Sequence, residues 1–412
     1  MSRARPKPAR RPAPKTAAGA GTPPKAAPKT AAGATATAAP KAVLLVRLGA
    51  ALVGLSILFS WWASPDRLVS LPWSVIALVG VAVVLVTTGP ALPVLARRLQ
   101  LKHLAWFFIS SGVIALLSAL FTSRWPTYKL AGLGPIYSAL PSIRSFSWGA
   151  AGLQPNQTGG FLAVCTGFAA AVAASPAAPR RGRVASLILA VLGTVVVFMT
   201  GSRAALAGLL LVFFAILVVR TRRALWAWAC GLLVVGVGLF ASGQASRFFG
   251  FFLQDEGLDT KLASRVDIWS SALRGIQDHF FTGIGLGVFN QVIPARYPYH
   301  VVGLSFPVSQ AHNLFLDVTL AIGFPGLVGL VLLLVGSVML AARWIGDRGP
   351  GAPIALGILG SMVVYLVFGT TDSISLSVPT SFIIWLWASS LVVLNEMRIR
   401  KPPDSSLRVG QG

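Results

Sequence analysis

Long apolar runs separated by short polar segments dominate the chain from residue 42 onward. They cover residues 42–63, 73–89, 103–122, 157–175, 184–200, 204–219, 224–241, 322–342, 353–371 and 379–395. Most approach the roughly 18–20 residues that an α-helix needs to cross about 30 Å of hydrocarbon. Backbone groups in a bilayer must be hydrogen-bonded internally, so each run predicts a helix. We therefore expect an all-α polytopic membrane protein with ten such helices and a further partial helix before residue 322.

The amino-acid composition also indicates a membrane protein. Hydrophobic residues make up 55% of the 412 residues, charged residues only 11%, and the mean hydropathy is +0.74. Such a chain is too apolar for an ordinary soluble globular domain. The two cysteines, Cys165 and Cys230, lie inside apolar runs, and we expect them to be packing residues rather than metal ligands.

Residues 1–41 differ from the rest of the chain. They contain nine basic and no acidic residues, with almost no large apolar side chains, and the sequence Pro-Lys-Thr-Ala-Ala-Gly-Ala at 14–20 recurs at 28–34. This composition predicts a disordered tail that attracts anionic membrane lipids, with no nucleic-acid partner. A transmembrane domain at 42–396 and a short tail at 397–412 are expected to follow.

Basic residues concentrate in alternate loops between the predicted helices. One side has Arg97, Arg98, Lys102, Arg180, Arg181, Arg183, Arg220, Arg222, Arg223, Arg343, Arg348, Arg398, Arg400 and Lys401. With the N-terminal tail, Arg47 and Arg408, this side carries 25 basic and 3 acidic residues, and the opposite side carries 10 basic and 8 acidic residues. Because cytoplasmic loops of membrane proteins are enriched in Lys and Arg, we expect both termini in the cytoplasm. The longest loop, 242–308, is then on the outer side.

An amphipathic helix is predicted within that loop, at residues 264–280. Its apolar face contains Ile268, Trp269, Ala272, Leu273, Ile276 and Phe280, and Asp267, Ser271, Arg274 and Asp278 lie on another face. Such a helix fits the membrane interface, with Trp269 at headgroup depth. With Ser264 as its cap, Arg265 would lie in the first turn, where the helix dipole disfavours a cation. An anionic partner, such as a lipid phosphate or Asp267, would explain this position.

Four local motifs occur on the predicted outer side. They are Gln154-Pro-Asn-Gln-Thr-Gly, Thr200-Gly-Ser-Arg203, Arg265-x-x-x-Trp269 followed by Gly283-x-Gly285, and His312-Asn313-x9-Gly323-x-x-Gly326. Together they resemble the bacterial O-antigen ligase family, which includes related polymerases and oligosaccharide transferases. The resemblance covers about residues 150–345. It implies a bundle of about 10–12 transmembrane helices, similar to the GT-C glycosyltransferases, with one large periplasmic loop containing amphipathic helices.

The resemblance implies transfer of a glycan from an undecaprenyl diphosphate carrier to an acceptor hydroxyl at the periplasmic face of the inner membrane. Arg203 and Arg265 would stabilise the diphosphate leaving group, because arginine is permanently charged and matches phosphate geometry. His312 would accept the proton of the hydroxyl, since histidine titrates near neutral pH. Substrate contacts are expected from Asn156, Trp269, Arg274 and Asn313. The acceptor is expected to be a glycan or a lipid, such as lipid A core, and direct displacement would invert the anomeric centre.

No cofactor and no metal are expected. The outer carboxylates do not show the Asp-x-Asp spacing that would hold a divalent cation, and arginines would take its place. Asp317 lies five residues after His312, too far round a helix to face the imidazole, so it is not expected to be its partner. Aromatic residues at 123–155, including Trp125 and Tyr137, would stack on sugars or form an interfacial belt.

Other functions remain open from the sequence. A polymerase of the same family would use a second lipid-linked repeat unit as the acceptor. A transporter or flippase of lipid-linked sugars would need polar groups in both halves of the membrane, but here they concentrate on one face, and the predicted helix interiors contain almost no ionisable groups.

Overall fold

The structure is a computed structural model of the whole chain. It describes residues 30–123, 125, 134–140, 154–220, 233–234, 237, 258–302, 308–345, 347–374, 376 and 379–400. The chain divides into two compact units, Met1–Ala38 and Ala39–Gly412, and the second contains the helix bundle described below.

Helices form nearly all the regular structure of the described residues. They are α1 (Thr30–Ala63), α2 (Arg67–Thr88), α3 (Leu92–Arg98), α4 (Leu101–Thr122), α5 (Gly134–Ala139), α6 (Pro155–Ala174), α7 (Arg180–Met199), α8 (Arg203–Arg220), α11 (Leu258–Asp278), α12 (Phe289–Arg296), α13 (Leu314–Ala342), α14 (Ala352–Gly369), a short 3-10 helix η3 (Pro379–Ser381) and α15 (Phe382–Arg400). Eight of the described helices are long and apolar enough to cross a membrane, namely α1, α2, α4, α6, α7, α13, α14 and α15. This confirms a multi-pass, all-α membrane protein.

Some predicted boundaries differ from the observed helices. The helix expected at 204–219 corresponds to α8, whose apolar part is shorter than the other spans, and most of the span expected at 224–241 lies outside the described residues. The helix expected to begin at 73 begins at Arg67. The side chain of Asp66 accepts a hydrogen bond from the amide of Val69 and caps this earlier start.

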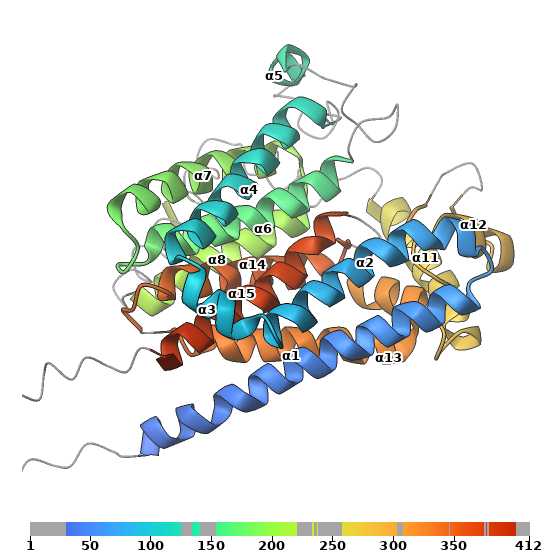
Figure 1. Cartoon of the computed structure of the whole chain (residues 1–412). Coiled ribbons are helices and arrows are strands. Elements are labelled where there is room, and N and C mark those ends of the chain that lie inside the picture. Colours follow the sequence, from blue (N-terminus) through green and yellow to red (C-terminus); the bar gives the residue numbers. More distant parts are fainter. Residues whose placement is uncertain are drawn as a thin grey trace, which may run out of the picture. The chain divides into compact units, whose positions relative to one another are not determined.

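The bundle is layered around α6 and α14. Figure 1 shows α6, α14 and α15 in its middle, with α4 and α7 on one side and α13 on the other. Gly167 of α6 faces Gly360 of α14, and a Cβ at Gly360 would lie only 2.7 Å from the Gly167 carbonyl oxygen. Small residues therefore allow these two backbones to approach closely, as is usual between membrane helices. The Ser361 hydroxyl adds a 2.8 Å hydrogen bond to the carbonyl oxygen of Val164 across the same interface.

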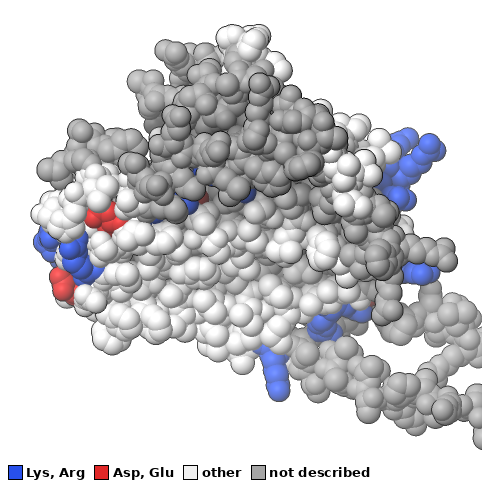
Figure 2. Space-filling model, turned by 180° about the vertical axis from the view of Figure 1, so that it is seen from behind, with Lys and Arg blue, Asp and Glu red and all other residues white. Residues whose placement is uncertain are grey.

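The two ends of the bundle carry different elements. Figure 1 shows α11 and α12 at the end where α1 connects to α2, whereas α3 lies at the other end. Charged side chains also join helices at the α3 end: Arg398 forms a 2.7 Å ion pair with Asp347, and Arg343 donates to Asn395. In Figure 2 the described surface between the two ends is mostly free of charged residues. Such a band is typical of a surface that faces lipid.

Helix α13 consists of two segments separated by a break. Gly323 has a φ of 75° and Ile322 has non-helical angles, so Leu314–Ala342 is kinked at the predicted Gly323–Gly326 position. The freed backbone groups bind the segment after α11: Ile284 N donates to Leu320 O at 2.8 Å, and Phe324 N donates to Phe280 O at 2.7 Å. The break expected from the sequence is therefore confirmed, and the segment after α11 is hydrogen-bonded to it.

Gly323 is required at this break for two reasons. Its positive φ is unfavourable for a residue with a Cβ atom, and a Cβ there would clash with the carbonyl oxygen of Phe281. The contact explains why the sequence has glycine at this position and why the outer segment can dock directly on the α13 backbone.

Replacing Gly323 with alanine should lower the free energy of unfolding by about 1–3 kcal/mol, because the backbone strain and the clash cannot both be relieved. Thermal unfolding in detergent measures the loss. Gly182→Ala is a matched control, since Gly182 lies in α7 with only ordinary contacts around its Cα, and it should be neutral or slightly stabilising. Equal melting temperatures for the two variants would contradict this account of the break.

Candidate active site

His312 immediately precedes α13 and has an unusual backbone conformation. Its φ is 51°, the only positive φ of a non-glycine residue in the described ranges. Such a conformation costs free energy and persists only where surrounding contacts enforce it, which is common at functional sites. The imidazole Nδ1 lies 3.1 Å from Oδ1 of Asp372, and the His312 side chain keeps 33% of its surface exposed, compared with 4% for Asp372. The ring is thus fixed on one edge and accessible on the other.

Asn313, next to His312, connects two helices. Its side-chain oxygen accepts hydrogen bonds from the amides of Phe315 and Leu316, which caps the start of α13. Its side-chain amide donates to the carbonyl oxygen of Thr370, at the end of α14, at 3.0 Å. Asn313 was expected to contact substrate; in this structure its side chain fixes the backbone that carries His312.

Trp269 of α11 holds the same loop from the other side. Its indole Nε1 donates to the carbonyl oxygen of Ala311 at 2.9 Å, so α11 is bonded to the residue before His312. The predicted apolar face of this helix is divided: Ile268, Ala272 and Ile276 are buried, whereas Leu273 and Phe280 are exposed. One part of the face forms a core with α12 and the other remains on the surface.

The start of α11 corrects the interpretation of Arg265. The helix begins at Leu258, so Ser264 is not its cap, and Arg265 lies beyond the first turn, where the dipole penalty is small. Pairing with Asp267 was the simplest structural explanation for this arginine. Asp267 instead accepts hydrogen bonds from the amides of His300, Val301 and Val302. Arg265 is half-buried, and no hydrogen-bond partner for it is found among the described residues.

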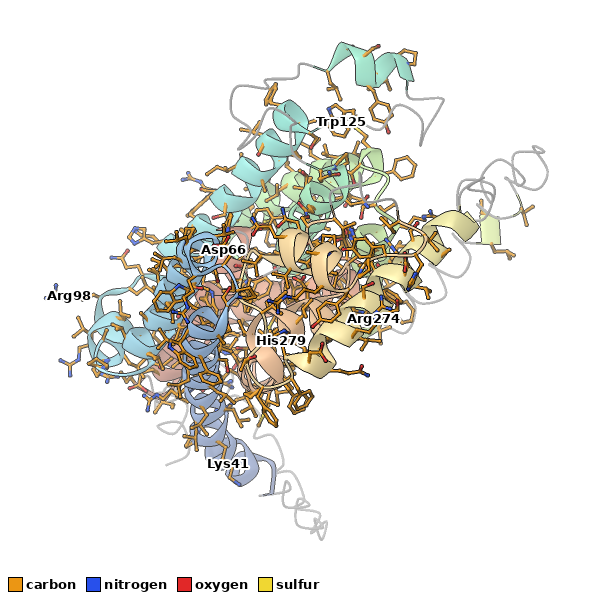
Figure 3. The ribbon with its side chains drawn as sticks, turned by 90° about the vertical axis from the view of Figure 1, so that its right-hand side faces the viewer. Lys41, Asp66, Arg98, Trp125, Arg274 and His279 are labelled. Atoms are coloured by element: carbon orange, nitrogen blue, oxygen red, sulfur yellow. The ribbon has the colours of Figure 1, made fainter. Side chains whose placement is uncertain are left out.

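Asp267 and Arg274 fix the segment after α12 to α11. Burial acts to raise the pKa of Asp267, but hydrogen bonds from His300, Val302 and Val301 outweigh it and keep the pKa below its ordinary value. Arg274 donates to the carbonyl oxygen of Pro298 at 3.1 Å and to the hydroxyl of Ser271. Figure 3 views the bundle from this end, with Arg274 on α11. The expected substrate contact of Arg274 is replaced here by contacts within the protein.

Asn156 and Arg203 lie at the ends of two adjoining helices. Asn156 is in the first turn of α6, Arg203 begins α8, and each makes further contacts of its own. Gly159 of α6 packs directly on Thr200, three residues before Arg203.

Packing contacts connect the start of α6 to the end of α14, and the end of α14 to the start of α13, which follows His312. Gly160 of α6 packs on the ring of Phe368 near the end of α14, and a Cβ at Gly369 would lie 3.0 Å from Cβ of Leu314 in α13. The structure therefore brings the helix ends that carry all four motifs to one end of the bundle.

Aromatic residues of the 123–155 loop are only partly described. Trp125 and Tyr137 stack on each other with centroids 5.7 Å apart, and the Tyr137 hydroxyl donates to the carbonyl oxygen of Met199. These two rings pack against the turn that leads to Arg203, which favours a structural role over sugar stacking.

Sequence reasoning missed Asp372, Gln310 and Ser373, all of which are buried. Asp372 was considered only as part of a possible metal-ligand spacing. Its one recognisable signal is a carboxylate in a very short outer connection, directly after an apolar helix. Among the described residues, no three His, Cys, Asp or Glu side chains gather as a metal site would require.

Residues 188–331 match a family model described as O-Antigen ligase. This match supports the resemblance of the chain to the O-antigen ligase family. The matched region runs from α7 into α13, so it includes Arg203, Arg265 and His312 and excludes Asn156 and Asp372. No curated protein matches the chain. The similarity supports a membrane glycosyltransferase-like enzyme that carries out ligase- or polymerase-type glycan transfer.

Replacing Asp267 with asparagine should loosen residues 298–302 at neutral pH, because charge-assisted hydrogen bonds to three amides are lost. Hydrogen exchange of these amides should accelerate roughly tenfold or more. In the wild type, the lowered pKa means that the carboxylate stabilises the loop above about pH 4 and loses this effect as the pH falls through the folded-state pKa. Exchange of these amides, measured by mass spectrometry and expressed relative to that of α14 at the same pH, should therefore rise at low pH in the wild type and vary less in the variant. Slow exchange in both proteins at all pH values would contradict this role.

Proposed function

We propose that this protein transfers a glycan from an undecaprenyl diphosphate-linked donor to an acceptor hydroxyl at the periplasmic face of the bacterial inner membrane. The acceptor would be lipid A core or another cell-surface glycan or lipid. The observation that supports this best is the His312–Asp372 pair, held on a constrained backbone at the end of the bundle that also carries the family's arginines. The excess of basic residues at the other end supports the assignment of that end to the cytoplasm.

His312 acts as the general base in this proposal. With the proton of the neutral imidazole on Nδ1, facing Asp372, the Nε2 lone pair is available to the acceptor hydroxyl. The hydroxyl oxygen bonds to the anomeric carbon as its proton moves to Nε2, and the bond from that carbon to the diphosphate oxygen breaks with its electron pair. Asp372 stabilises the imidazolium that results. A direct displacement of this kind inverts the anomeric centre.

Arg203 and Arg265 stabilise the leaving diphosphate. Arginine presents a fixed fork of donors to phosphate oxygens, and one well-placed donor can lower such a barrier by about 3–4 kcal/mol. Two guanidinium groups supply positive charge that a divalent cation would otherwise supply, so we propose a metal-independent reaction. Asn156, in the first turn of α6, is the proposed further contact with the donor. Trp269, Arg274 and Asn313 act indirectly, by holding the loops that carry the site.

His312→Ala and Arg265→Ala should each reduce glycan transfer by purified protein about 10²-fold or more, because a general base and a leaving-group contact are lost. Release of undecaprenyl diphosphate measures the rate. His103→Ala and Arg97→Ala are matched controls, since both residues are exposed near α3, at the other end of the bundle, and they should retain full activity. Full activity of both site variants would contradict the proposal.

The family's polymerase reaction differs from the ligase reaction only in the acceptor, and gene deletion distinguishes them. Loss of a ligase should leave long lipid-linked polymer, whereas loss of a polymerase should leave single lipid-linked repeat units. Gel analysis of lipid-linked glycan measures the product. Flipping of donor lipid by purified protein without any transfer would instead support a transporter.

A further inference from the structure

We propose that Gln310 and Ser373 are positioning residues that fix Asp372 as the acceptor of the His312 Nδ1 proton and connect it to Asp317 of α13. This inference rests on the proposed function for its catalytic meaning, but its structural content can be tested separately. Neither residue belongs to the His312-Asn313 motif or to the arginine motifs.

The hydrogen bonds to Asp372 determine its role. Its Oδ1 accepts from Gln310 Nε2 at 2.7 Å, from the Ser373 backbone amide at 2.9 Å, and from His312 Nδ1 at 3.1 Å. The backbone and amide donors are N–H groups that cannot accept a hydrogen bond, so this oxygen of Asp372 is the acceptor in both contacts. The shortest of the three bonds comes from Gln310.

Gln310 has both ends of its amide engaged. Its side chain is buried, with 3% of the residue exposed, and an unbonded amide there would be costly. Nε2 donates to Asp372, and Oε1 accepts from the Ser373 hydroxyl at 3.1 Å. The reverse orientation of the amide would place Oε1 against a carboxylate oxygen. Gln310 is therefore held in one orientation, and it holds Asp372 in turn.

Ser373 extends the network into α13. Its hydroxyl also lies 3.3 Å from Oδ2 of Asp317, and Oδ1 of Asp317 accepts from the backbone amide of Ala311 at 3.2 Å. Three consecutive residues are thus fixed: Gln310 through its amide, Ala311 through both backbone groups, and His312 through its ring. This set of contacts accounts for the positive φ of His312, because the backbone cannot relax without breaking several of them.

Few ionisable groups surround His312 within these contacts. Asp372 comes from the α14–α15 connection, and Asp317 comes from α13. The contact from α11 is the indole of Trp269, which does not titrate, and the buried Tyr365 of α14 is close to Asp317. A new charge at position 310 should consequently change the electrostatic environment of the His312 imidazole.

The test uses purified full-length protein with labelled histidine. The chain has only four histidines, so the imidazole nitrogen resonances of His312 can be assigned by their loss in His312→Gln. Gln310→Met preserves volume but removes both hydrogen bonds, Gln310→Glu adds a negative charge, and Ser373→Ala removes the hydroxyl. Ser361→Ala is the matched control, because this serine is also buried and hydrogen-bonded but lies within α14, away from His312 and Asp372.

We expect the wild type and Ser361→Ala to show neutral His312 with its proton on Nδ1. Gln310→Met and Ser373→Ala should lose this single tautomer and reduce kcat about tenfold with KM unchanged, since neither residue contacts substrate. Gln310→Glu replaces the Nε2 donor with an oxygen and should likewise lose the single tautomer.

If His312 in folded Gln310→Met and Gln310→Glu gives the same imidazole resonances as in the wild type, the proposal is overturned, whatever the activity of these variants. If the resonances change as expected but the wild type transfers no glycan, positioning is correct and the proposed function is wrong. Loss of activity together with the expected change in the resonances supports both.

Discussion

The buried carboxylate of Asp372 is the interaction on which the candidate site depends. Removing an anion from water costs several kcal/mol unless hydrogen bonds replace its hydration. Here the replacement comes from Gln310 and His312 before α13 and from the backbone of Ser373 after α14. Separating these segments would leave a buried charge unpaired. The need to satisfy one carboxylate therefore holds together two parts of the chain and aligns the imidazole between them.

The break in α13 provides the second constraint. Backbone groups freed at Ile322 and Gly323 must find partners, and the segment from Phe280 to Gly285 supplies them. This arrangement docks the outer loop on a transmembrane helix, and Trp269 then bonds to Ala311 at the start of the same helix. Helix α11 and the segment that follows it are thus attached to both ends of one short helical segment, which begins directly after His312.

Features that depend on local spacing were predictable. The apolar runs, the α11 helix and the break at Gly323 are properties of short stretches, and each is observed except the run at 224–241, which lies mostly outside the described residues. Asp372 was missed because 60 residues separate it from His312, and no local pattern records a contact of that range. The start of α11 was wrong because one serine was taken as a cap although the helix continues before it. The helical periodicity of α11 predicts its apolar face, but it does not show which residues of that face are covered by other elements and which remain exposed.

The sequence by itself determined that the chain is a helical membrane protein, the approximate positions of the eight spans among the described residues and which family its motifs resemble. These follow from the cost of burying backbone groups in lipid and from residue spacing along the chain. Only the tertiary structure decided that His312 pairs with Asp372, that Trp269 and Asn313 fix its loop, and that Asp267 binds backbone amides rather than Arg265. The reason is physical: a buried polar group takes whichever partner folding places beside it, and folding places residues from different helices side by side.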